Sequence, residues 1–400
     1  MKLGWLLFAL GVTACTSASA VLDSYEEPPR ESRVPDAAAP DDGGLDAEAG
    51  EVDAGPCADC EYFPETCTAD VLCPNGPFDP NRPGGALDPR TSINVIRGRS
   101  ASDIWAAGAV GALAHFDGTS WSVSDPGSYE TMRALWLRDS SEVSLGVLKY
   151  VYARGVEIPD GGAGPSDGGW TVVSPTYPPG QLPTTALLLS AWAAPGSEWL
   201  WCATKGTNSF GVGGLWRIRQ SSPTAFEGGT GIPASVCSTL GCGQVYGIHG
   251  ESANELWAVG PAGTTIRVSN AESAAPSAKA FNSQTWNALN GVWAASATDA
   301  WSVGATGVIR HYTGDPSLWE IVSGVPTNVD LNAVWGSSSS DVWAVGDAGV
   351  VLHYDGKSWS RVKVAGLGND RPNLTTVWVA APGHVWIGGK GVILSLGGKP

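Results

Sequence analysis

Three histidines recur at one position of a repeated sequence phrase, and imidazole is a common zinc ligand. His115, His311 and His353 each follow a glycine by four residues, in a short run of apolar and aromatic residues. Each belongs to its own copy of the phrase, and equivalent positions on separate repeats lie far apart. Because a metal site needs ligands that converge on one point, we expect these histidines to be structural and expect no metal or cofactor.

Cysteines are the second group with chemical potential, and six of them form two clusters: Cys57, Cys60, Cys67, Cys73, then Cys237 and Cys242. In an exported chain, which the N-terminus indicates below, such clusters favour disulfides. A zinc site is the alternative for the first cluster, although its second pair lacks the Cys-x-x-Cys spacing. No βαβ pattern surrounds "CADC", as a thioredoxin-like motif would require. Cys237 and Cys242 would join within one loop, leaving Cys202 as a buried thiol.

The repeated phrase itself has the pattern of short antiparallel strands. Its last copy, "DVWAVGDAGVVLHYDGKSW" (341–359), alternates β-branched or bulky runs with glycine-containing turns. Asp355-Gly356 is a hairpin signal, since glycine tolerates the positive φ of a tight turn. The segment "LNAVWGSSSSD" (331–341) adds a strand upstream. Each unit therefore has four strands, A to D, and its apolar B and C strands indicate a sheet covered on both faces.

Seven copies can be counted from the last bulky residue of strand A. These residues are Arg97, Trp136, Trp192, His249, Trp293, Trp335 and Trp378, separated by 39, 56, 57, 44, 42 and 43 residues. Periods of this length with four strands each predict an all-β fold, a single β-propeller over residues 85–400. Seven blades is the prediction; six or eight remain alternatives, because the second and third copies are degenerate. Most of the tryptophans recur in register and are expected to pack between blades.

The last copy stops after strand C, which leaves one sheet a strand short. A ring closes if a segment before Ile93 supplies the missing outer strand. We expect part of residues 61–92 to pair with residues 391–396 and to cover an otherwise exposed sheet edge.

The repeats resemble known families. The pattern Trp-x-Val-Gly, Gly-x-Ile/Val and Asp-Gly-x-x-Trp is similar to the repeats of bacterial sialidase-like propellers, of photosystem II assembly-factor-like propellers and of tectonin lectins. "HYDGKSW" resembles the Asp-box hairpin, but it lacks that motif's serine and Gly356 directly follows Asp355. The resemblance covers about residues 93–400 and implies a propeller without selecting one family or function.

A sialidase-like hydrolase would need three arginines around a carboxylate and a tyrosine nucleophile beside a glutamate. Arg97, Arg133 and Arg267 lie on predicted strands of different units, but no Tyr-Glu pair is identifiable. The chain also lacks a phosphate-binding glycine loop, a serine-nucleophile elbow and a His-Glu-x-x-His motif. The sequence therefore favours a protein that is not an enzyme.

Two adjacent units are followed by long connections, "SPTYPPGQLPTT" (174–185) and "GTGIPASVCSTLGCGQ" (229–244). Both join strand D to the next strand A, so both should rise from the same face and could form a binding wall. Tyr177, between stiffening prolines, is expected to be an exposed aromatic anchor. Trp199 and Trp216 fall outside the repeat register and could stack on a sugar. Neutral variation of surface loops is the alternative.

The N-terminus gives the expected location. "MKLGWLLFALGVTAC" has one basic residue and an apolar run too short to span a bilayer. Val12-Thr13-Ala14-Cys15 matches the bacterial lipobox, and this resemblance implies a signal peptide (1–14) and lipidation of Cys15. Thr16 in place of an aspartate favours the outer membrane, on its periplasmic or cell-surface side. Residues 15–56 then form a disordered acidic tether and 57–84 a Cys-rich segment.

Charge narrows the range of partners. The net charge of −16 makes nucleic acid and anionic lipid poor ligands. The sequence thus predicts a lipid-anchored, extracytoplasmic propeller that binds an unknown protein or glycan as a non-enzymatic binding or scaffold module. A tectonin-like lectin and a sialidase-like glycoside hydrolase are the alternatives.

Overall fold

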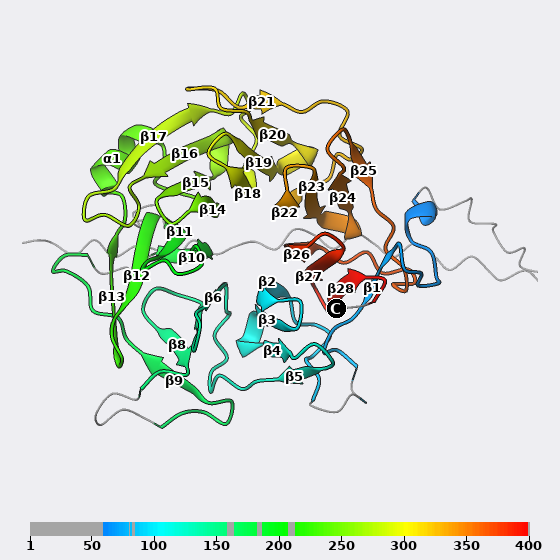
Figure 1. Cartoon of the computed structure of the whole chain (residues 1–400), viewed down its shortest axis with the longest axis horizontal. Coiled ribbons are helices and arrows are strands. Elements are labelled where there is room, and N and C mark those ends of the chain that lie inside the picture. The colour runs from blue at the N-terminus through cyan, green and yellow to red at the C-terminus, as the bar shows by residue number, and fades with distance from the viewer. Residues whose placement is uncertain are drawn as a thin grey trace, which may run out of the picture. The chain divides into compact units, whose positions relative to one another are not determined.

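The computed structural model describes residues 59–79, 81, 85–157, 164–181, 186–206 and 213–398. These residues form seven four-stranded antiparallel sheets arranged as blades around an axis (Figure 1). The chain is a seven-bladed β-propeller, as the repeat count predicts. The signal peptide, Cys15, the tether and Cys57 lie outside the described residues.

Blades 1 to 4 each run in chain order from the inner strand outward. Their strands are β2 (Ile93–Ser100), β3 (Asp103–Gly108), β4 (Leu113–Phe116), β5 (Trp121–Val123); β6 (Ala134–Leu137), β7 (Glu142–Leu145), β8 (Val151–Arg154), β9 (Trp170–Val173); β10 (Ala186–Trp192), β11 (Leu200–Gly206), β12 (Gly214–Ser222), β13 (Ala225–Thr230); β14 (Gly247–Ser252), β15 (Glu255–Val259), β16 (Thr264–Ser269) and β17 (Ser277–Asn282). We refer to the four positions as strands A to D. The A strands of neighbouring blades contact one another around the axis.

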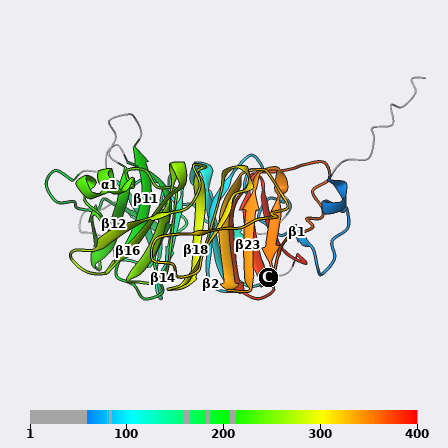
Figure 2. The same cartoon turned by 90° about the horizontal axis from the view of Figure 1, so that it is seen from above.

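Blades 5 and 6 repeat this order, and blade 7 departs from it only in its outer strand. Their strands are β18 (Leu289–Ser296), β19 (Asp299–Gly304), β20 (Ile309–Tyr312), β21 (Glu320–Ile321); β22 (Leu331–Ser338), β23 (Asp341–Gly346), β24 (Val351–Tyr354), β25 (Trp359–Arg361); β26 (Leu374–Ala381), β27 (His384–Gly389), β28 (Val392–Leu396) and β1 (Leu72–Pro74). One α-helix, α1 (Ala234–Leu240), lies between blades 3 and 4, and a single helical turn, η1 (Cys60–Tyr62), precedes β1. Four further turns, η2 to η5, join strands B and C at Ala109–Gly111, Pro261–Gly263, Ala305–Gly307 and Asp347–Gly349. Seen edge-on, the blades stand side by side as a disc (Figure 2).

The two faces of the disc carry different connections. One face carries the D-to-A and B-to-C connections, and we call it the loop face. The other carries the A-to-B and C-to-D connections, and we call it the turn face. The two long segments singled out in the sequence, 174–185 and 229–244, both fall in D-to-A connections, and the second connection runs from residue 231 to residue 246.

The ring closes within blade 7, where the first strand of the structure pairs with the last. β1 runs antiparallel to β28, with Leu72 opposite Leu396 and Pro74 opposite Leu394. The Leu72 side chain is fully buried, and its backbone N–H donates to the Lys363 carbonyl in the adjacent loop at 3.0 Å. The predicted closure is confirmed: a segment before Ile93 covers the edge that strand C would expose.

The Asp-Gly-x-x-Trp hairpin of blades 1 and 6 positions the tryptophan that begins strand D. In blade 6, the Asp355 carboxylate accepts hydrogen bonds from the backbone N–H groups of Lys357 and Ser358, both at 2.9 Å. Gly356 has a φ of 90°, and a Cβ there would approach the Ser340 Cβ to 2.8 Å. The turn therefore needs glycine on two counts, and it places Trp359 at the start of strand D.

That strand D tryptophan packs against a strand B tryptophan of the preceding blade. The pairs are edge-on, with ring centroids 4.9 to 5.5 Å apart: Trp121–Trp386, Trp170–Trp105, Trp319–Trp257 and Trp359–Trp301. Such geometry favours the contact of a positive ring edge with a negative ring face. The tryptophan register seen in the sequence is thus an inter-blade contact.

A second contact links each regular blade to the following one near the axis. The side-chain amides of Asn94, Asn290 and Asn332 donate to the carbonyls of Met132, Leu331 and Leu374, each at 2.9 Å, at or just before the start of the next strand A. The Thr375 hydroxyl donates in the same way to Ile93. This explains the polar second residue of the "LNAVW" phrase, which satisfies a carbonyl that is otherwise buried between blades.

Candidate functional site

A hollow of about 800 Å³ opens on the turn face, above the ends of the A strands. Its wall comes mainly from blades 2 and 3: the A-to-B connections near 138–141 and 193–197, and the C-to-D segments near 155–157 and 220–223. Volumes of this size are typical of ligand sites. A second, smaller space of about 110 Å³ continues along the axis between the A strands.

The inner end of the hollow is the ring of seven residues by which the blades were counted. Arg97, Trp136, Trp192, Trp335 and Trp378 line the hollow, and His249 and Trp293 complete the ring beside them. Trp335 is in contact with both titratable members of the ring, Arg97 and His249. The guanidinium of Arg97 lies 4.4 Å from its ring centroid, and the His249 ring meets it edge-on at 4.7 Å.

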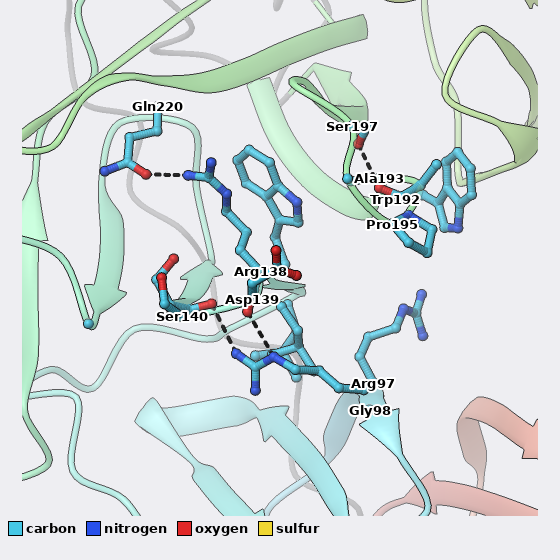
Figure 3. Close-up of a pocket in the computed structure, with 18 of the residues that line it drawn as sticks. Arg97, Gly98, Arg138, Asp139, Ser140, Trp192, Ala193, Pro195, Ser197 and Gln220 are labelled. Atoms are coloured by element: carbon cyan, nitrogen blue, oxygen red, sulfur yellow. Dashed lines mark hydrogen bonds between the residues drawn. The ribbon is translucent and has the colours of Figure 1, made fainter.

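Arg97 is the cation at this inner end, and it lacks a carboxylate partner among the described residues. Its one hydrogen bond there runs from Nη1 to the carbonyl of its neighbour Ile96, at 2.7 Å. Burial lowers its pKa from 12.5 to about 10, so the group remains protonated at neutral pH. Figure 3 shows the side chain extending toward Trp192 and Pro195. Its remaining N–H groups are available to a ligand.

His249 does not neutralise this cation. It is 6% exposed, and its Nδ1 accepts a hydrogen bond from the backbone N–H of Ala294 at 3.2 Å. Burial, and then the nearby Arg97 charge, hold the pKa of His249 well below 6.5. The imidazole is therefore neutral near pH 7 and packs against Trp192, with the two rings tilted by 42° and their centroids 4.8 Å apart.

The wall adds two further arginines. Arg138 donates to Gln220, a neutral partner (Figure 3). Its guanidinium carbon lies 5.0 Å from the centroid of the Trp136 ring. Arg99 is neutralised, because it forms ion pairs with Asp103 at 2.8 Å and Glu142 at 2.7 Å. Two exposed carboxylates, Asp139 and Glu157, also line the hollow.

This arrangement is suited to binding. Trp335 offers a partly exposed indole surface, whereas Trp136, Trp192 and Trp378 are 5–8% exposed and line the hollow as a rigid apolar wall. Arg97 and Arg138 offer charged donors without carboxylate partners in the described structure. Within the residues that the structure describes, no group of three or more His, Cys, Asp or Glu is placed to hold a metal ion. No described helix combines the length and the apolar character needed to cross a membrane.

The recurring histidines have local partners. His115, His311 and His353 each hydrogen bond through Nε2 to an aspartate at the start of strand B, at 2.8 Å. Each ring also stacks on the cross-strand tryptophan of its own blade, with centroids 3.8 to 4.6 Å apart. These contacts account for the position of each histidine.

The three aromatic residues expected to bind a ligand do not form an exposed site. Tyr177 is only partly exposed: its hydroxyl donates to the Leu148 carbonyl at 2.6 Å, and its ring meets Trp216 at 6.1 Å. Trp216 is 2% exposed, so it cannot stack on a ligand in this conformation. Trp199 is half-buried beside Arg217 and Arg219, whose guanidinium carbons lie 4.2 and 4.7 Å from its ring. The expectation of an exposed anchor at Tyr177 is wrong, because the hydroxyl satisfies a carbonyl of the neighbouring blade.

The sialidase-type arginine set is not assembled either. Arg97 and Arg133 both line the axial space, but Arg267 lies on β16, a third strand outward. Arg267 pairs with Glu255 at 2.9 Å and lies over the Trp257 ring. Its charge is therefore paired with a carboxylate of its own blade.

Two cysteine pairs are at disulfide distance. Cys237–Cys242 is the pair that the sequence predicted, and Cys67–Cys73 lies within the first cluster, for which the sequence left the pairing open. Cys60 is also disulfide-bonded, and Cys202 is a free buried thiol whose pKa is raised by burial. Cys237 and Cys242 belong to the apolar cluster between blades 3 and 4, together with Val245 and Leu256. The second disulfide thus supports packing of its loop against the blades.

The sequence did not point to the hollow. Its wall residues Arg138, Gln220 and Pro195 belong to no motif. The available signal was irregularity: the eight-residue step loses its second tryptophan at Trp136 and lengthens by one residue after Trp192. Those two blades line the hollow.

Comparisons with known proteins agree with the fold. No protein-family model and no curated protein matches the chain. Among solved structures, YCF48 bound to D1 peptide is similar with a TM-score of 0.57 and 16% identity, covering 83% of this chain and 96% of that one. YCF48 from Cyanidioschyzon merolae gives 0.56 and 14%, covering 77% and 95%. The WD40 β-propeller domain of Doa1 gives 0.52 and 9%, covering 76% and 91%. These similarities define the class of fold and no function.

Proposed function

We propose that this protein is a lipid-anchored, extracytoplasmic β-propeller that binds a segment of another protein in the turn-face hollow. The observation that carries the proposal is the hollow itself, about 800 Å³ lined by four tryptophans and by arginines without carboxylate partners in the described structure. Aromatic and arginine side chains are the residues that contribute most to protein–protein binding energy. A structural neighbour, YCF48, is bound to a D1 peptide, which is consistent with a peptide-binding propeller.

A pair of matched substitutions tests the site. Ser140→Trp places an indole at the exposed rim of the hollow, and Ser235→Trp places the same side chain at an exposed position of α1 on the loop face. The probe is a set of random peptides selected on the full wild-type chain and measured by fluorescence polarisation. We expect Ser140→Trp to weaken binding about tenfold or more, roughly 1.4 kcal/mol, and Ser235→Trp to leave it unchanged.

The reverse pattern would move the site to the loop face, where the long connections lie. If both variants bind the peptides with wild-type affinity, neither face of the propeller is the binding site. A glycan array and a fluorogenic glycoside panel on the same proteins test the two alternatives. Glycan binding without peptide binding would favour a lectin, and turnover of a glycoside would favour a hydrolase.

The anchor is tested separately, because it rests on the lipobox. Cys15→Ser should move the protein from the detergent phase to the aqueous phase, since the acyl chains supply the membrane attachment. Detergent partitioning of both forms in the host bacterium measures this. Equal partitioning of the two forms would contradict the lipid anchor.

A further inference from the structure

Arg97 occupies a position that favours an aromatic residue in most blades. Five of the seven equivalent strand A positions are tryptophan and one is histidine. Arginine at this position places a cation between indole rings near the axis of the propeller. An aromatic residue would fill the space without the cost of desolvating a charge.

No described carboxylate compensates that cost. Arg97 forms no ion pair with any residue that the structure describes, and its contacts there are with neutral groups, the Ile96 carbonyl and the Trp335 ring. The nearest titratable member of the ring, His249, accepts from a backbone N–H and is neutral. Buried charges in proteins are normally paired, and unpaired ones lower the stability of the folded state.

The axial space contains a second cation without an ion-pair partner in the described residues. Arg133 stands at the strand A position that holds asparagine in blades 1, 5 and 6, and it lines the same 110 Å³ space as Arg97. Burial lowers its pKa below 12.5. The space along the axis is therefore lined by two positive charges, although the chain as a whole carries a net charge of −16.

The Arg97 side chain extends from the axial space into the hollow, so its positive charge faces a ligand bound there. The same side chain lines both the axial space and the hollow, and Figure 3 shows it extending toward Trp192 and Pro195. The exposed carboxylates Asp139 and Glu157 also line the hollow, whereas Arg97 is half-buried in strand A. A planar guanidinium with free N–H groups matches a carboxylate by two parallel hydrogen bonds.

We propose that the hollow recognises a carboxylate of the bound protein segment, which forms a charge-assisted pair with Arg97 above the Trp335 ring. The inference rests on the proposed peptide-binding function and specifies the group that is recognised. The carboxylate belongs either to a free chain terminus or to an Asp or Glu side chain. Arg97 is a binding residue in this account, and the stability that its burial costs is recovered when the anion pairs with it.

The experiment compares four pools of random octapeptides, labelled at the N-terminus with a fluorophore that has no carboxyl group, on the full chain. They combine a free or an amidated C-terminus with the presence or absence of Asp and Glu. We expect pools with a carboxylate to bind about tenfold tighter than the amidated pool without Asp and Glu, about 1.4 kcal/mol. The two pools with a single carboxylate source show whether the terminus or a side chain is read. Equal binding of all four pools would overturn the proposal without any mutant.

Substitutions at Arg97 give the second arm. Arg97→Met should abolish the preference for carboxylate and should melt at the same or a higher temperature, because it removes an unpaired buried charge. Arg97→Lys should retain part of the preference, since it keeps the charge and loses the planar fork. Arg90→Met, at a side chain 88% exposed, changes the net charge equally and should have no effect.

The two proposals fail differently. If Ser140→Trp abolishes binding while Arg97→Met keeps the carboxylate preference, the hollow binds peptides and the role of Arg97 is wrong. If Ser140→Trp leaves binding intact, the site itself is wrong. A preference lost in Arg97→Met and kept in Arg90→Met supports the proposal.

Discussion

A chain that starts at Gly85 should lose the stable propeller, because it lacks β1. Without β1, β28 becomes an open edge strand, and the apolar cluster of blade 7 loses Phe63 and Leu72. Burial of such side chains contributes about 1.5–3 kcal/mol each, so the loss is on the order of 5 kcal/mol. That is a large fraction of the 5–15 kcal/mol typical of a domain. We expect a fall of about 10 °C or more in melting temperature by circular dichroism, with aggregation detected by light scattering.

The matched control is a chain that starts at Pro56. It lacks Cys15 and the tether just as the shorter chain does, but it keeps β1. Its melting temperature should equal that of the Cys15→Ser protein. If the two truncated chains have the same melting temperature, β1 does not stabilise the ring. A single substitution, Leu72→Asp, gives a further check, since it removes the fully buried side chain while it keeps the strand.

Trp386→Ala should be the most damaging single substitution at a blade seam. Trp386 is fully buried and meets the rings of Phe116 and Trp121 of blade 1, at 5.1 and 5.5 Å. Truncation of a buried tryptophan to alanine costs about 3–5 kcal/mol. Urea unfolding followed by tryptophan fluorescence measures the loss. Trp286→Ala, at a side chain 89% exposed, should have almost no effect.

A double-mutant cycle isolates the contact across the seam. The indole N–H of Trp386 has no hydrogen-bond partner in the structure, so Trp386→Phe removes volume and no hydrogen bond and should cost less than Trp386→Ala. Trp121→Ala and Trp386→Ala together should cost about 0.5–1.5 kcal/mol less than their sum, because they remove the same pair. Full additivity would show that the two rings do not stabilise each other.

The regular part of the fold was predictable because its residues act locally and repeat. The hairpin Asp355-Gly356, the tryptophan spacing and the missing last strand were enough to predict blades and closure. The sequence predicted that tryptophans pack between blades, but it did not predict which rings meet. The role of Asn332 was not predicted, because its acceptor, the Leu374 carbonyl, lies on the next repeat and no spacing rule identifies it.

The packing contacts of the long loops were not predicted, for a physical reason. A loop rich in proline and polar residues is usually exposed and available for binding. Here the tryptophan pair and the asparagine contact are both absent, among the described residues, from the seams on either side of blade 3. Tyr177 reaches Leu148 across one of these seams, and the helix α1 with its disulfide packs into the other. The loops stabilise seams that lack the regular contacts.

The hollow was not predictable because it depends on what blades 2 and 3 lack. Blade 2 keeps the eight-residue step but lacks its second tryptophan, and blade 3 lengthens the step by one residue. The A-to-B connections of these two blades, near 138–141 and 193–197, line the hollow. Arg97 was noted only as a strand residue, because its lack of a described ion-pair partner is a property of the assembled ring.

The seam contacts also bear on how a gene for such a protein can change in length. The strand D tryptophan reaches backward to one neighbour and the strand A asparagine reaches forward to the other, so both halves of each contact are encoded in every regular repeat. A tandem duplication or deletion of one whole repeat therefore leaves each new seam with matching halves. Because β1 and β28 join inside a blade, the N-terminal strand is encoded apart from the array and can close rings of different repeat number. Recombination in whole repeats can thus alter this gene without the simultaneous substitutions that a new interface elsewhere would require.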